Sequence, residues 1–165
     1  MGWEIHRVLE ADPIKVQYYW QTLYMEGGLD KRLCNIENPT WSDVQDLIRN
    51  QGQWMYMIWD HDRGEYTAEF LLEGFTGKAA MIHVSTHPKN ELKYSLELGI
   101  GCSNLMIQQG FSALYGITPM TNRAACIFAL KCGFKKIGIL PQGILDRGVF
   151  ADAMISIKSE ITHGR

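Results

Sequence analysis

Hydrophobic and polar positions follow two different periods along the chain, and each change of period marks a new element. Apolar residues recur at helical spacing after Asp12 and after Thr40, and again over residues 121–132. Between residues 54 and 86, apolar runs are separated by short turns, which predicts an antiparallel meander. The predicted strands cover residues 3–8, 54–59, 65–75, 79–86, 111–117, 136–140 and 149–157, with a further helix from Pro88 to near Gly110. The predicted order is therefore β-α-α-β-β-β-α-β-α-β-β, an α/β (α+β) pattern within one domain spanning residues 1–165.

Capping residues define where the predicted helices begin and end. Asp12 followed by Pro13 opens the first helix, and the T-W-S-D run from Thr40 is typical of a capping box. Gly27-Gly28 and Gln51-Gly52 would end these two helices. The segment 121–136 reads TNRAACIFALKCGFKK, in which Asn122 or Thr121 can cap the helix and Gly133 allows the left-handed turn at its end.

Composition excludes several classes of protein. The chain has 165 residues, 46% hydrophobic and 21% charged, with a net charge of −2 and no long basic run. Nucleic acid and membranes are therefore not expected partners. No apolar run approaches the ~20 residues that cross a bilayer, and the charged N-terminus does not resemble a secretory signal. The four cysteines form no C-x-x-C pair, which favours reduced thiols, no metal site and a cytoplasmic location.

One motif resembles a known family. From Asn122 the chain reads N-x-x-A-x-x-F-x-x-K-x-G-F, and together with the element order this resembles the GNAT superfamily of N-acetyltransferases. The resemblance implies a mixed, mostly antiparallel sheet of about six to seven strands flanked by four helices. It also implies that the sheet splits after residues 79–86, with residues 111–117 running parallel to that strand. Acetyl-CoA would lie in the split as a cosubstrate.

The resemblance also assigns the residues that would bind the cosubstrate. The backbone of Val84, Ser85 and Thr86 would pair with pantetheine, and Asn122 would lie on the opposite wall. The family's phosphate loop reads Q/R-x-x-G-x-G, and its nearest match here supplies Gly99 and Gly101, with Leu96 in place of Gln or Arg.

Two placements of these glycines are open. They either cradle phosphate at the start of a helix that begins near Gly99, or lie inside a helix that begins near Glu91. The spacing from Pro88 to Gly110 favours the second placement, and a carboxylate at Glu91 would repel a pyrophosphate.

Candidate catalytic groups are few. His83 lies on the polar face of residues 79–86 and could act as general base. The position at which many family members carry an acidic tyrosine holds Ala129, which leaves Tyr115 and Tyr94 as candidate proton donors. His83 and His87 cannot share a metal, because i and i+4 positions of a strand lie ~13 Å apart.

Two carboxylates and one thiol complete the set. Glu69 and Glu73 either flank an amine or form the solvated face of their strand, and the strand alternation favours the solvated face. Cys126 is expected to be a small buried thiol rather than a nucleophile.

Two functions remain open. The first is an acyl-CoA-dependent N-acetyltransferase in which an amine, on a small molecule or a protein, attacks the thioester directly. The second is a non-catalytic GNAT-fold protein with protein partners and an assembly role, such as phage head assembly. The weak glycine motif and Ala129 fit the second function, whereas the intact Asn122 helix favours the first.

Overall fold

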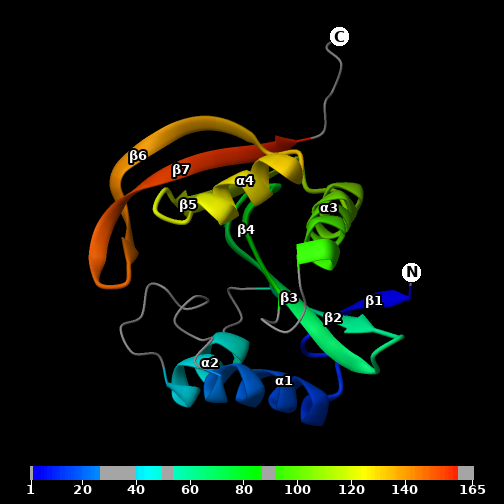
Figure 1. Cartoon of the computed structure of the whole chain (residues 1–165). Helices are drawn as coiled ribbons and strands as arrows, with labels where there is room; N and C mark the ends of the chain where they lie inside the picture. Colours follow the sequence, from blue (N-terminus) through cyan, green and yellow to red (C-terminus); the bar gives the residue numbers. More distant parts are fainter. Residues whose placement is uncertain (1, 27–39, 50–53, 87–91, 160–165) are drawn as a thin grey trace. The chain divides into compact units, whose positions relative to one another are not determined.

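The computed structural model describes residues 2–26, 40–49, 54–86 and 92–159 (Figure 1). Its contacts divide the chain into two compact units. Unit 1 comprises Met1–Leu72 with His83–Glu91, and unit 2 comprises Glu73–Ile82 with Leu92–Arg165.

The element order agrees with the predicted order. The helices are α1 (Pro13–Met25), α2 (Trp41–Arg49), α3 (Leu92–Gln108) and α4 (Arg123–Lys131). The strands are β1 (Trp3–Arg7), β2 (Trp54–Asp60), β3 (Glu65–Thr76), β4 (Ala79–Thr86), β5 (Ala113–Pro119), β6 (Lys135–Asp146) and β7 (Val149–Ser159). They form a 7-stranded sheet in the order β1-β2-β3-β4-β5-β7-β6, which confirms the predicted mixed, mostly antiparallel fold class. Within the described ranges, every helix is too short or too polar to span a lipid bilayer.

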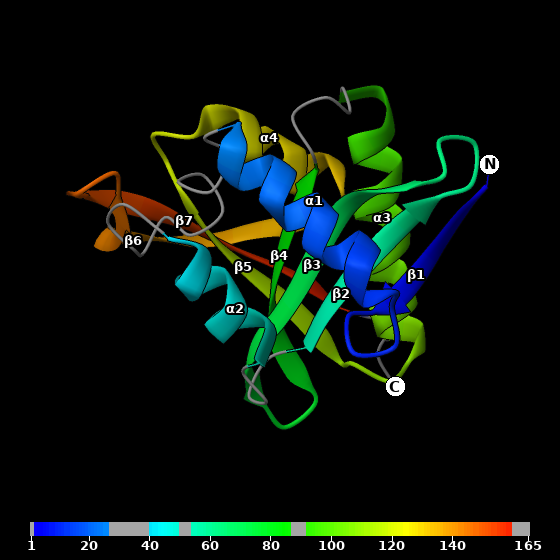
Figure 2. The ribbon, with the colours of Figure 1, turned by 90° about the horizontal axis from the view of Figure 1, so that it is seen from below.

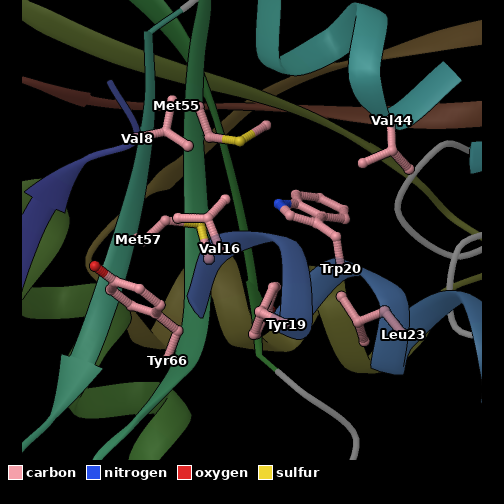
Figure 3. Close-up of a cluster of buried hydrophobic side chains, with 9 residues drawn as sticks. All are labelled: Val8, Val16, Tyr19, Trp20, Leu23, Val44, Met55, Met57 and Tyr66. Atoms are coloured by element: carbon pink, nitrogen blue, oxygen red, sulfur yellow. The ribbon is translucent and has the colours of Figure 1, made fainter. Parts of the chain in front are cut away.

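Unit 1 is organised by the apolar face of α1. Val16, Tyr19, Trp20 and Leu23 repeat at helical spacing and are all buried. Figure 2 shows α1 crossing β2 and β3, which pair with each other antiparallel. The resulting cluster, drawn in Figure 3, comprises Val8, Val16, Tyr19, Trp20, Leu23, Val44, Met55, Met57 and Tyr66.

The predicted caps of unit 1 form as expected. The carboxylate of Asp12 accepts the backbone N–H of Ile14 at 2.9 Å and that of Lys15 at 3.4 Å. At α2, the side chain of Asp43 reaches back to the backbone N–H of Thr40 at 2.6 Å, the reciprocal bond of a capping box. The predicted ends of these helices, Gly27-Gly28 and Gln51-Gly52, lie outside the described residues.

In unit 2, β4 runs parallel to β5, as predicted, over Ala79–Met81 and Ala113–Tyr115. The strands β6 and β7 form a hairpin that pairs with β5 through β7. The strand β6 extends well beyond the predicted 136–140, because a register shift between Leu140 and Ile144 accommodates Pro141 within an edge strand.

The helix α4 begins and ends at the predicted residues. The side chain of Asn122 accepts the backbone N–H of Ala125 at 3.1 Å. At the other end Gly133 adopts φ +91°, and its N–H donates to the carbonyl of Leu130 at 3.1 Å.

The contact between α3 and α4 depends on Gly99. A Cβ atom at this position would lie 2.6 Å from both the Sγ atom of Cys132 and the Cζ atom of Phe128. No side chain fits at such distances, because protein interiors are already close-packed. Gly99 therefore allows α4 to approach α3 closely.

This contact predicts the effect of Gly99→Ala. Overpacking costs about 1–3 kcal/mol and the helix propensity of alanine returns about 1 kcal/mol, so we expect a net loss of unfolding free energy of up to about 2 kcal/mol. Urea unfolding measures it. Gly99→Ala should also be made in a Phe128→Leu variant. That variant lacks the Cζ atom that the new methyl group would meet, so the loss of unfolding free energy should be smaller there. An equal cost in both backgrounds, or a gain of stability in the wild type, would contradict the packing role.

Candidate active site

A carboxylate is buried on the sheet face that α1 covers. Glu69 of β3 is 5% exposed and pairs across the sheet with Met57, a member of the apolar cluster of unit 1. The hydroxyl of Tyr19, from α1, donates a hydrogen bond to the Glu69 carboxylate. The hydroxyl of Ser85, from β4, donates a second. Three elements of unit 1 thus converge on one acidic group.

Burial dominates the electrostatics of this group. Removal of the Glu69 carboxyl from water raises its pKa well above the ordinary value of 4.5, and the hydrogen bond from Ser85 opposes this rise. The preference for a solvated Glu69 was therefore wrong. Consecutive residues of β3 are buried, so both faces of this strand are covered. The alternation of side chains therefore does not indicate which of its residues contact solvent.

The strand β4 carries the predicted pantetheine-pairing residues and the predicted base. His83, Val84, Ser85 and Thr86 are all half-buried and belong to unit 1. His83 and Ser85 point to the same face of the strand, because they are two positions apart. Ser85 bonds to Glu69 of the strand β3, so His83 lies on the sheet face on which the Glu69 carboxylate is buried. His87 lies outside the described residues.

The glycines expected to cradle phosphate are instead internal to a helix. Gly99 and Gly101 both lie inside α3, which begins at Leu92, as the second placement predicts. Their assignment as cofactor-binding residues at a helix start is corrected accordingly, and Gly99 serves the contact with α4. The first turn of α3 holds no acidic residue. Glu91 lies outside the described residues.

Tyr115, the predicted proton donor, is held at the start of β5. Its hydroxyl donates to the backbone carbonyl of Gly74 at 2.7 Å, and Tyr115 pairs with Met81 in the first half of β4. The hydrogen bond to Gly74 therefore indicates a structural role for Tyr115. The side chain of Tyr94 is not described.

Asn122 is exposed, and its side-chain oxygen is engaged as the cap of α4. It belongs to unit 2, as do Gly99, Gly101 and Tyr115, whereas His83, Val84, Ser85 and Thr86 belong to unit 1. Cys126 is half-buried rather than fully buried, and burial raises the pKa of its thiol, which makes it a poor nucleophile.

Comparison with known proteins identifies the fold. No family model and no curated protein sequence matches the chain. A spermidine N-acetyltransferase from Vibrio cholerae, solved in complex with CoA and spermine, superposes with a TM-score of 0.77, at 12% identity, over 95% of this chain and 95% of that chain. A ribosomal-protein-S5-alanine acetyltransferase from Vibrio fischeri gives 0.72, at 11% identity, over 100% and 97%. The chain has the GNAT fold. At these identities the likeness concerns architecture, and chemistry has to be argued from the residues.

Sequence reasoning did not find Tyr19 and assigned Glu69 to solvent. The strand itself gave no clear signal: 65–75 reads EYTAEFLLEGF, in which Glu65, Glu69 and Glu73 interrupt the apolar positions at every fourth residue. This spacing places all three glutamates on one face of the strand, which is also the pattern of a solvated face. The sequence shows no sign of the role of Tyr19 either, because an aromatic residue on the apolar face of a helix is usually a core residue.

The raised pKa of Glu69 predicts how stability changes with pH. A carboxyl whose folded pKa lies above 4.5 binds its proton more tightly in the native state. Its contribution to stability is therefore present below 4.5 and is lost as the pH rises through the folded pKa. We expect wild-type stability, relative to Glu69→Gln, to fall over this range, measured by urea unfolding between about pH 4 and pH 8.

The control for this experiment is Glu65→Gln, which neutralises an exposed carboxylate on the same strand and should keep the wild-type pH profile. If the difference in unfolding free energy between the wild type and Glu69→Gln does not vary with pH, the Glu69 carboxyl is not desolvated.

Proposed function

We propose that the protein transfers an acetyl group from acetyl-CoA to an amine, with Glu69 as the general base. The observation that carries this proposal is the buried carboxylate of Glu69, held by hydroxyls from α1 and β4 on one face of a GNAT-fold sheet. Burial of a carboxylate costs free energy even when hydrogen bonds offset part of the cost. A buried carboxylate with a perturbed pKa is therefore a candidate functional group.

The chemistry needs one proton acceptor and one electrophile. The nitrogen of a neutral amine forms a bond to the thioester carbonyl carbon, the carbon–sulfur bond breaks, and CoA leaves as a thiolate that takes a proton from solvent. The ionised Glu69 accepts the proton that the amine nitrogen loses. A raised pKa suits this step, because a carboxylate with a higher pKa is a stronger base toward the amine proton.

His83 is the second candidate base. It lies on the same face of β4 as Ser85 and is half-buried, so it is more accessible than Glu69. We place Glu69 first because Tyr19 and Ser85 hold its carboxylate in a defined orientation. For the cosubstrate, the proposal retains the backbone of Val84, Ser85 and Thr86 as the pantetheine-pairing edge.

A melting-temperature shift tests cosubstrate binding. Acetyl-CoA at 100 times its dissociation constant stabilises the native state by about 2.7 kcal/mol, which gives a clear rise in Tm. The same rise is expected for Glu69→Gln, because Glu69 is assigned to chemistry rather than to CoA binding. No rise for the wild type at millimolar acetyl-CoA would contradict the transferase and leave the assembly role as the alternative.

Release of the CoA thiol in the presence of an amine tests the chemistry. Spermidine and an alanine-terminated peptide are suitable first acceptors, because structural neighbours act on such groups. With an acceptor that supports turnover, Glu69→Gln should lower kcat by about 10²–10⁴-fold, the range of general-base catalysis. The wild-type kcat should rise with pH through the pKa of Glu69. A comparable loss in His83→Gln, with Glu69→Gln active, would transfer the role to His83.

A further inference from the structure

A pocket lies wholly within unit 1, between α1 and the turn that joins β2 to β3. Its volume is about 360 Å³, in the lower part of the range of ~300–1,000 Å³ typical of small-molecule sites. Aromatic rings form much of its wall: Tyr18 and Tyr19 from α1, Trp59 from β2 and Tyr66 from β3. Trp59 and Tyr66 meet edge to face, with ring centroids 5.1 Å apart.

Two opposite charges line the same pocket without neutralising each other. The Nζ atom of Lys15 lies 4.0 Å above the centroid of the Trp59 ring, where the cation–π attraction holds it. Glu65 is an exposed carboxylate at the start of β3. Among the residues that the structure describes, neither side chain forms an ion pair.

The remaining charge of the pocket is already compensated. The Nε atom of Arg63 lies 3.6 Å from the carboxylate of Asp60, which is 2% exposed. That carboxylate also accepts the backbone N–H groups of Asp62 and Arg63, at 2.9 Å and 3.1 Å. The turn therefore presents a fixed geometry, and the charges available to a ligand are one ammonium, from Lys15, and one carboxylate, from Glu65.

We propose that this pocket binds a free α-amino acid with a large apolar side chain. Such a ligand carries a carboxylate for Lys15 and an ammonium group for Glu65, and its side chain would pack on the aromatic wall. A polyamine would place a cation against Lys15, and a phosphorylated ligand would place an anion against Glu65, so both are disfavoured.

The pocket and the buried carboxylate share one residue. Tyr19 lines the pocket, and its hydroxyl donates to Glu69. The binding site nonetheless stands independently of the proposed transferase, because the ligand is recognised by Lys15, Glu65 and the aromatic wall. It can be tested without acetyl-CoA, and Tyr19→Phe should retain binding while it alters any activity that depends on Glu69.

Calorimetric titration with L-phenylalanine tests the proposal against two analogues. The analogue 3-phenylpropionate lacks the amine, and phenethylamine lacks the carboxylate. Because hydrogen bonds to charged groups are the strong ones, L-phenylalanine should bind at least about tenfold more tightly than either analogue.

Two charge-removing variants separate the two contacts. Lys15→Gln should weaken L-phenylalanine about tenfold and leave phenethylamine unchanged, whereas Glu65→Gln should weaken L-phenylalanine similarly and leave 3-phenylpropionate unchanged. Lys15 and Glu65 are exposed, so both variants should fold. Lys78→Gln, at an exposed lysine of unit 2, is the matched control and should bind as the wild type.

Three results would overturn the proposal. These are the absence of L-phenylalanine binding to the wild type, affinities for both analogues equal to that for L-phenylalanine, and binding that neither Lys15→Gln nor Glu65→Gln weakens. If L-phenylalanine binds as expected but acetyl-CoA produces no shift in Tm, the pocket stands and the transferase does not.

Discussion

The desolvation of one carboxylate constrains the whole of unit 1. Glu69 sits on a sheet face whose other buried groups are mainly apolar, and an ionised carboxylate placed there without partners would cost several kcal/mol. The hydroxyls of Tyr19 and Ser85 supply those partners, which ties the position of α1 to β3 and β4. Close packing of the apolar cluster holds α1 against the sheet. The hydrogen bond from Tyr19 gives it a defined register.

Two faces of α1 serve different surfaces. Val16, Trp20 and Leu23 fill the apolar cluster, while Lys15 and Tyr18 face the pocket beside the β2–β3 turn. Tyr19 belongs to both sets, since its ring lines the pocket and its hydroxyl reaches Glu69. Any ligand that contacts this ring therefore contacts the residue that orients the buried carboxylate.

Local signals predicted the framework of the fold well. The caps at Asp12, Thr40 and Asn122 and the left-handed turn at Gly133 appear where the sequence indicates them, because capping depends on residues three or four positions apart. The burial of Glu69 was missed because it depends on α1, fifty positions away in the chain. Alternation along a strand gives the two faces but does not tell whether a helix covers each of them.

Gly99 shows how one residue type can satisfy two unrelated constraints. Read along the chain, Gly99 and Gly101 resemble a displaced phosphate loop, since glycine lets backbone approach an anion closely. In the structure the close approach at Gly99 is to Cys132 and Phe128 of the α4 segment, and the missing Cβ serves helix packing. The spacing of glycines is the same under both readings, so it cannot by itself support CoA binding. The two roles are distinguished by the space around the glycine. A Cβ atom at Gly99 would clash with Cys132 and Phe128, so Gly99 has a role in helix packing.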